Sequence, residues 1–337
     1  MKAMPCATSS DRSLGRTARV FAAAMIGLLA SAGFSTAEAQ AFPSRPLSLV
    51  VPSAPGDPAD SMARLLAPKM AERLGQPVLI ENRQGASMQI GSAYVAKSPP
   101  DGHTMLVALS AHVVNQVAFK NLPYDTLRDF SAVSLLARQP LCIAANASVK
   151  GANLREFIQA AKAQPPGTLN FGSIGTGTLL YLVVEEINRR SDLGMVHVAF
   201  KGGGPVLQAV LANEIQVVAL FPGFVSPHFR SGKLKPLAVT SSQRLRDLRD
   251  VPTVAESGFP GFEANNWVGV FVPSATPGAV VSRLNAELTT ALNDVRDKVV
   301  AAGFEVVAST PQELDRFVRA ETEHWANFAR EFNMQFE

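Results

Sequence analysis

Three times along this chain, a short apolar run ends in a loop of small residues and a helical pattern begins directly afterwards. The three junctions cover residues 49–58, 169–178 and 196–205. A helix start leaves backbone N–H groups without partners inside the helix, and such groups attract anions. No obvious nucleophile, base or cluster of metal ligands accompanies any junction. The pattern therefore predicts that the protein captures a carboxylate without performing chemistry on it.

Apolar runs and amphipathic patterns alternate in the order that is typical of an α/β fold. Strands are predicted at 47–51, 77–80 and 103–108, with helices at 58–74 and 91–97 between them. This βαβαβ order predicts a parallel sheet with helices on both faces. A second alternation of strands and helices follows from residue 154. Ligands of such sheets bind at the carboxyl ends of the strands, where the junction loops lie.

Two extended stretches, near residues 137–146 and 263–271, are suited to carry the chain between two lobes. We therefore expect residues 41–140 and 268–337 to form lobe 1, and residues 141–267 to form lobe 2. The ligand would lie between the lobes, and closure would bend the two connections.

The first 39 residues have the features of a secretory signal peptide. Four basic residues precede an apolar stretch at 20–34, and Ala37-Glu38-Ala39 forms a small-x-small cleavage site. The apolar stretch is too short for a typical membrane span, although a retained anchor is the alternative interpretation. Cleavage near Ala39 leaves Cys142 as the one remaining cysteine, which we expect to be buried and inert. An exported domain without disulfides fits a bacterial periplasm.

The charge of the mature chain excludes some partners. Without residues 1–39, 27 basic and 26 acidic residues remain of the original 31 and 28, so the net charge is about +1. This balance argues against nucleic acid or an anionic membrane as a partner.

The first junction offers its loop backbone and one carboxylate to a ligand. The candidate binding residues there are Ala54, Pro55, Gly56 and Asp60. Asp57 suits an N-cap and Pro58 suits the first helical position, so a self-capped helix start with nothing bound is the alternative. In the binding interpretation Asp60 orients loop amides or water, because two carboxylates in direct contact repel each other.

The second and third junctions are rich in glycine and hydroxyl groups. The candidate binding residues are Ser173, Thr176, Gly177, Thr178, Gly202 and Gly203. Glycine permits close approach of the backbone to a ligand, whereas the alternative is a tight turn followed by a helix cap. Three consecutive glycines at 202–204 exceed what a turn needs, which favours donation of backbone N–H groups to a ligand.

A hydrolase that uses Ser173 and His197 is the main enzymatic alternative. Phe171 stands where a hydrolase elbow has its first glycine, and no residue is positioned in the sequence to orient the histidine. Glycines at 175 and 177 without a third do not make a dinucleotide-binding loop, and the five histidines are scattered. We therefore expect a protein that is not an enzyme and that holds no cofactor and no metal.

Motifs spread over nearly the whole mature chain resemble those of one family, the substrate-binding proteins of tripartite tricarboxylate transporters, also called the Bug family. The motifs are Val51-Pro52-x-x-Pro55-Gly56-x-x-x-Asp60, Gln76-Pro77-Val78, Glu81-Asn82-Arg83-x-Gly85-Ala86, Pro100-Asp101-Gly102-x-Thr104, Leu122-Pro123-Tyr124-Asp125, His197-Val198-x-x-Lys201-Gly202-Gly203, Gly232-Lys233-Leu234 and Val251-Pro252-Thr253-Val254-Ala255-Glu256-Ser257-Gly258.

The resemblance implies a type II periplasmic binding protein, a two-lobed Venus flytrap in which each lobe is a mainly parallel sheet flanked by helices. It implies that the protein captures a small organic carboxylate between the lobes and delivers it to a transporter with one large and one small integral membrane subunit. The contacts that it implies are Ala54, Gly56, Asp60, Ser173, Thr176, Gly177, Thr178 and Gly203. We expect a monomer, and the alternative function is a ligand sensor that signals to a membrane kinase.

The chain departs from the family pattern at several candidate ligand-facing positions. Asp57 stands where the family often has glycine, and Leu179-Leu180-Tyr181 stand where it often has small polar residues and a histidine. Gln216 and Leu220 stand where it often has aspartate, and at the Leu220 position, which can face the ligand, an aspartate would suit an amino group. We therefore hypothesise that the ligand is an aromatic or otherwise apolar carboxylate rather than an α-amino acid.

Overall fold

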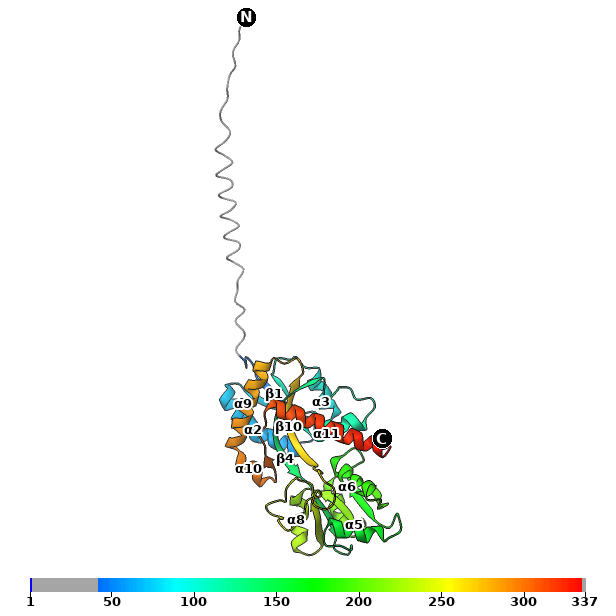
Figure 1. Ribbon diagram of the computed structural model, residues 1–337. Coiled ribbons are helices and arrows are strands. Elements are labelled where there is room, and N and C mark those ends of the chain that lie inside the picture. Colours follow the sequence, from blue (N-terminus) through cyan, green and yellow to red (C-terminus); the bar gives the residue numbers. More distant parts are fainter. Residues whose placement is uncertain (2–41, 335–337) are drawn as a thin grey trace. The chain divides into compact units, whose positions relative to one another are not determined.

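The computed structural model describes Met1 and residues 42–334 of the chain (Figure 1). The predicted signal peptide and its cleavage site near Ala39 lie outside the described residues, apart from Met1. From Arg45 onward the chain forms one structural unit, which contains two β-sheets with helices packed on them. Within the described residues, no helix combines the length and the apolar character needed to cross a membrane.

The first sheet is built around two parallel pairings. Within the described residues its strand order is β11 (Glu305–Val306), β4 (Phe130–Pro140), β10 (Asn265–Pro273), β3 (Thr104–Leu109), β1 (Leu47–Val51) and β2 (Val78–Asn82). Strand β1 is parallel to β2 and β3, whereas β10 is antiparallel to β3 and β4, and β11 is antiparallel to β4. The nearly continuous apolar sequence of β1 suits a strand that is covered on both faces.

The second sheet repeats this combination of parallel and antiparallel strands. Its order in the described part of the chain is β7 (Val196–Ala199), β6 (Asn170–Ser173), β8 (Val217–Leu220), β5 (Cys142–Asn146) and β9 (Leu234–Val239). Strand β6 is parallel to β7 and β8, whereas β5 is antiparallel to β8 and β9. The predicted α/β class with two helix-flanked sheets is confirmed, but both sheets are mixed rather than mainly parallel.

In each sheet, the strand that enters from the other sheet, β10 or β5, is antiparallel to both of its neighbours. Strand β4 of the first sheet is followed, after Leu141 alone, by β5 of the second sheet. The chain returns just before β10, where the Ala264 N–H donates to the Thr240 carbonyl at 3.0 Å. A strand that enters from the other sheet runs against the strands of a βαβ unit, which explains the mixed pairing. The predicted division into lobes at residues 140/141 and 267/268 stays a prediction.

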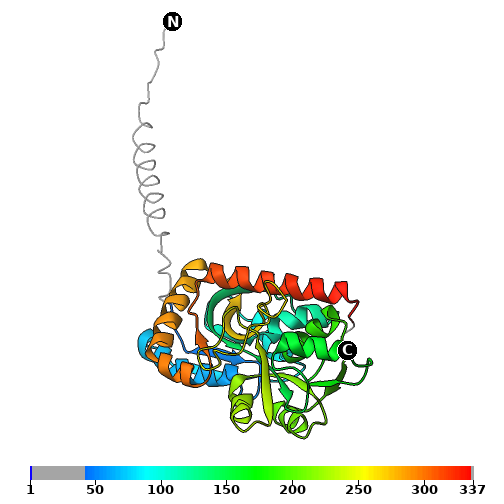
Figure 2. The ribbon, with the colours of Figure 1, turned by 60° about the horizontal axis from the view of Figure 1, so that its bottom comes forward.

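Helices cover both sheets (Figures 1 and 2). The helices formed by segments next to the first-sheet strands are α2 (Pro58–Leu74), α3 (Gln89–Ala96), α4 (Ala111–Ala118), α9 (Gly278–Asp294), α10 (Arg296–Ala301) and α11 (Pro311–Glu331). Those formed between the second-sheet strands are α5 (Leu154–Lys162), α6 (Leu179–Arg190), α7 (Gly203–Leu211) and α8 (Pro222–Arg230). Cys142 is completely buried as predicted, and burial raises the pKa of its thiol, which keeps the sulfur protonated.

Helix α11 carries a carboxylate that faces a buried tryptophan of β10. The helix, red in Figure 2, begins in a capping box in which Thr310 and Glu313 bond reciprocally. Further along, Glu321 Oε2 accepts a hydrogen bond of 2.8 Å from Trp267 Nε1. Burial raises the pKa of Glu321 to about 7, although the bond from Trp267 and the nearby His324 lower it. The carboxylate is therefore held in surroundings that disfavour its charge.

Glu321→Gln should remove a pH dependence from the stability of the protein. Because the pKa of Glu321 is about 7 in the folded state and the ordinary value is 4.5, unfolding releases a proton between these values, and stability falls as the pH rises. Glutamine keeps an acceptor for Trp267 without the charge, so the variant should gain on the order of 2 kcal/mol over the wild type between pH 5 and pH 8.

Urea unfolding at both pH values measures this difference. Glu323→Gln, on the exposed side of the same helix, is the matched control and should follow the wild type. An identical loss of stability with pH in the Glu321→Gln variant and the wild type would contradict the assignment.

Candidate functional site

A cavity of about 290 Å³ lies where strand ends of both sheets meet. Leu109 at the end of β3, Leu220 at the end of β8 and Asn266 of β10 line it. The other lining residues are Asp57, Pro58, Ser87, Met88, Ser110, Ala111, Ile174, Gly177, Thr178, Leu179, Leu180, Gly203, Phe221 and Phe224. The carboxyl ends of strands are the usual ligand sites of open α/β sheets.

Helix starts converge on the cavity from both sheets. Within the described residues, six helices have their cap or first residue in the wall: α2 with Asp57, α3 with Met88, α4 with Ser110, α6 with Thr178, α7 with Gly203 and α8 with Phe221. The junction patterns predicted the starts of α2, α6 and α7. They missed α3, α4 and α8, although Pro222 at the first position of α8 is a recognisable helix-start signal.

Most of these helix starts lack a side-chain cap. Asp57 caps α2 by accepting from Ala59 N at 3.2 Å, and Thr178 caps α6 by accepting from Tyr181 N at 3.4 Å. Among the described residues, no side chain caps the starts of α3, α4, α7 or α8. Gln89 N of α3 donates to the Ala86 carbonyl, and Pro222 at the start of α8 has no N–H. Other N–H groups in the first turns of these four helices have no partner inside the helix, and the helix dipoles make this wall attractive to negative charge.

On the first-sheet side of the cavity, a buried pair of polar residues provides one side-chain donor. Ser110 Oγ donates to Asn266 Oδ1 at 2.8 Å, and both residues are buried. This bond occupies the amide oxygen of Asn266 and leaves its Nδ2 group as a donor in the cavity wall. Sequence reasoning missed Asn266 because the pair Asn265-Asn266 at the start of the apolar strand β10 forms no recognisable motif.

The first loop places its predicted contacts behind the cavity wall. Ala54, Pro55, Gly56 and Asp60 do not line the cavity, whereas the neighbouring Asp57 and Pro58 do. The Asp60 carboxylate accepts from Gly56 N at 2.8 Å, Arg64 Nε at 2.8 Å and Asn82 Nδ2 at 3.0 Å. Burial alone would raise the pKa of Asp60, but these bonds outweigh it and lower the pKa. Asp60 therefore remains ionised, and its carboxylate holds the Gly56 amide of the loop in place.

The second and third loops contribute three predicted residues directly. Gly177, Thr178 and Gly203 line the cavity, whereas Ser173, Thr176 and Gly202 do not. A Cβ atom added at Gly203 would meet no atom within 4 Å, so the backbone faces open space there. The structure thus brings three of the ten predicted binding residues together in one cavity wall. That these ten residues bind a ligand stays a prediction.

Ser173 and His197, the pair of the hydrolase alternative, do meet. Ser173 Oγ lies 2.7 Å from His197 Nε2 and accepts from Gly175 N at 3.1 Å. Ser173 is completely buried and lies outside the cavity wall, and within the described residues no carboxylate bonds to the imidazole. Burial lowers the pKa of His197, which keeps the ring neutral. The pair holds the loop that leads into α6.

The residues that depart from the family pattern divide between two roles. Leu179, Leu180 and Leu220 line the cavity, as the ligand hypothesis requires. Tyr181 does not line it, because its ring packs against Phe171 and His197 with centroid distances of 5.9 and 4.7 Å. The apolar character of the cavity therefore comes from the leucines and from Phe221 and Phe224 rather than from Tyr181.

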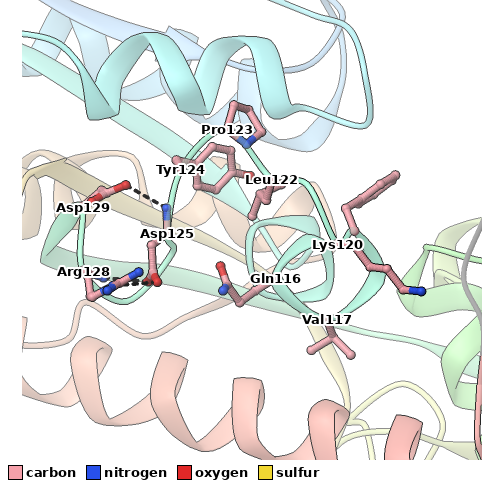
Figure 3. A pocket seen from close by; sticks show the side chains of 10 residues that line it. Gln116, Val117, Lys120, Leu122, Pro123, Tyr124, Asp125, Arg128 and Asp129 are labelled. Atoms are coloured by element: carbon pink, nitrogen blue, oxygen red, sulfur yellow. Dashed lines mark hydrogen bonds and ion pairs between the residues drawn. The ribbon is translucent and has the colours of Figure 1, made fainter.

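A second hollow, beside the end of α4, is less suited to an anionic ligand (Figure 3). Two basic residues, Lys120 and Arg128, line it together with two acidic ones, Asp125 and Asp129. The Arg128 charge is already paired, because Arg128 Nε donates to Asp125 Oδ2 at 2.8 Å. Tyr124, also part of the Leu122–Asp125 motif, packs against Phe130 with a centroid distance of 5.6 Å. This motif therefore has a structural explanation.

Known proteins resemble this chain over nearly all of its described length. The family described as "Tripartite tricarboxylate transporter family receptor" matches residues 62–334. Protein BugT of Bordetella pertussis is 34% identical over 314 residues, which cover 91% of this chain and 96% of BugT.

Two solved structures extend this likeness to the fold. MatC of Rhodopseudomonas palustris, solved with bound malate, is 34% identical to this chain and has a TM-score of 0.70. The match covers 85% of this chain and 99% of the MatC chain. Rpa4515 of R. palustris, solved with adipate, is 31% identical with a TM-score of 0.72 and matches over 86% and 97%.

The matched family spans far more than half of the chain, and the fold and the cavity at the strand ends agree with it. The chain belongs to the tripartite tricarboxylate transporter receptor family, whose structural relatives are two-lobed periplasmic solute-binding proteins.

Proposed function

We propose that this protein is a periplasmic solute-binding protein that captures a small organic carboxylate in the cavity between its two sheets. It then delivers the unaltered acid to the integral membrane subunits of a tripartite tricarboxylate-type transporter. The observation that carries the proposal is the set of uncapped starts of α3, α4, α7 and α8 in one cavity wall. Related proteins solved with malate and adipate support a carboxylate as the ligand class.

The wall binds an anion without a basic side chain. Among the described residues that line the cavity there is no lysine, arginine or histidine. One helix start stabilises an anion by about 0.3–2 kcal/mol, whereas micromolar binding requires about −8 kcal/mol. Several helix starts and Asn266 must therefore act together on one carboxylate group and its surroundings. Binding that depends on this convergence is reversible, as a transport protein needs.

The donors of the wall come from both sheets. Helices α3 and α4 belong to segments of the first sheet, and α7 and α8 to segments of the second. A carboxylate that contacts both sets joins the two sheets, and Leu141 and the residues before Asn265 are where the connecting strands change sheet. We therefore infer a closure motion about these two crossings when the acid binds.

Ligand binding should compact the protein. Because the bound acid joins donors of both sheets, the radius of gyration measured by small-angle X-ray scattering should decrease at saturating ligand. The acid is first identified by mass spectrometry of the molecule that copurifies with the protein. Identical scattering curves with and without this acid would contradict closure, and the forward scattering tests the predicted monomer.

Gly203→Leu should abolish binding with little loss of stability. A Cβ atom at position 203 meets nothing within 4 Å in the folded protein, so the leucine fits the fold but fills the cavity that Gly203 lines. Calorimetric titration with the copurified acid should show at least a 100-fold loss of affinity, or about 2.7 kcal/mol.

Gly204→Leu is the matched control for this variant. Gly204 is the next residue of α7, also has open space around its Cβ position, and does not line the cavity. Equal affinities of the two leucine variants would place the acid elsewhere.

Ser173→Ala distinguishes the proposed binding protein from a hydrolase. Loss of the hydroxyl removes the bonds to Gly175 N and His197, so the variant should lose about 1–2 kcal/mol of unfolding free energy in urea. Neither protein should hydrolyse p-nitrophenyl acetate faster than a heat-denatured sample. Ester turnover by the wild type that disappears in the variant would reverse the assignment.

A further inference from the structure

The cavity wall has two chemically different sides. All the large apolar side chains of the second-sheet side come from residues 174–224, and they are Ile174, Leu179, Leu180, Leu220, Phe221 and Phe224. The first-sheet side contributes Met88 and Leu109 and also most of the polar side chains, among them Ser87, Ser110 and Asn266. A molecule that fits both sides therefore has one polar end and one apolar body.

The wall provides no cation for a second negative charge. Of the described residues that line the cavity, Asp57 is the one with an ionisable side chain, and it is an acid. Burial raises the pKa of Asp57, although hydrogen bonds from Ala59 N and Ser53 lower it, and the charge of Asp60 raises it further. Burial therefore disfavours the charge of Asp57 itself, and this residue supplies no cation to a second carboxylate.

A second carboxylate would have to lie against the leucines and phenylalanines of the second-sheet side. Burying a carboxylate there without a charged partner costs several kcal/mol in desolvation, whereas a methylene or an aromatic ring gains free energy there. The volume of about 290 Å³ also lies at the lower end of the usual range of ligand pockets, roughly 300–1,000 Å³, which favours a compact acid.

We propose that this cavity selects an acid with a single carboxylate and an apolar aliphatic or aromatic body, and that it rejects dicarboxylates of the same length. The inference rests on the proposed function, because it concerns the ligand of the same cavity. A preference for a single carboxylate would distinguish this chain from the relatives that were solved with malate and adipate, which are both dicarboxylates. The apolar wall of residues 174–224 is the discriminating element.

Hexanoate and adipate are the matched probes for this proposal. The two acids have the same six-carbon chain, and a methyl group in hexanoate replaces the second carboxylate of adipate. Calorimetric titration of the wild type at pH 7.5 should give at least a tenfold higher affinity for hexanoate. Equal or tighter binding of adipate would overturn the proposal while leaving the proposed function intact. Binding of neither probe, nor of any acid in a panel of mono- and dicarboxylates, would overturn both.

A cation introduced into the apolar wall should weaken or cancel the preference for hexanoate. Phe224 lines the cavity but is 48% exposed, so Phe224→Lys keeps its charged end hydrated and should preserve the fold. The ratio of adipate to hexanoate affinity should rise at least tenfold in this variant, which corresponds to ~1.4 kcal/mol.

Val300→Lys is the matched control for Phe224→Lys. Val300 is 54% exposed on α10 and does not line the cavity, so this variant adds the same charge elsewhere on the surface. Its affinity ratio should equal that of the wild type. An equal rise of the ratio in both lysine variants would attribute the preference to net charge and overturn the role of the wall.

Discussion

The structure depends on backbone N–H groups that its helices leave without partners. A helix start that is buried without a cap is costly, and natural chains therefore satisfy it with a side chain, with water or with a ligand. Here α3, α4, α7 and α8 all begin at one cavity without a side-chain cap, and no basic side chain lines that cavity within the described residues. An anion that enters the cavity satisfies donors that the fold cannot satisfy itself.

These donors are held in place by residues that do not touch the cavity. Asp60 fixes the first loop through Gly56 N and Asn82, and Ser173 fixes the second through Gly175 N and His197. Fixing the loops before the ligand arrives reduces the entropy that binding must overcome. The family motifs that contain Asp60 and His197 are therefore explained by the support of the loops.

The mixed sheets follow from the two-lobed arrangement. Parallel strands with helices between them, such as β2-β1-β3 and β7-β6-β8, put their carboxyl ends and the following helix starts on one edge. Strands β10 and β5, which enter each sheet from the other, run against them. Bending at Leu141 and before Asn265 would move one set of helix starts relative to the other while leaving each sheet intact.

A large part of the secondary structure was predictable because it depends on residues that are close together in the sequence. The strands at 47–51 and 103–108 and the helix at 58–74 follow from apolar runs and cap residues that are adjacent in the sequence. Helices α4 and α8 begin after a single residue that follows the preceding strand, and the loop before α3 includes Arg83, Gln84 and Met88. None of the three therefore matched the small-residue loops of the junctions, and their place at the cavity was not recognisable. The departure at Tyr181 was interpreted as ligand-facing, but a helix turns each successive side chain by about 100°, and this one packs away from the cavity.

The sequence by itself determined the α/β class, the family and the helix starts that suit an anion, because each of these depends on residues that are close neighbours along the chain. Only the tertiary structure decided which helix starts share a cavity, that Asp60 and Ser173 lie behind its wall, and that Asn266 and Phe224 lie in it. Those facts depend on how two sheets from distant segments are packed, and long-range packing leaves no periodic signal in a single sequence.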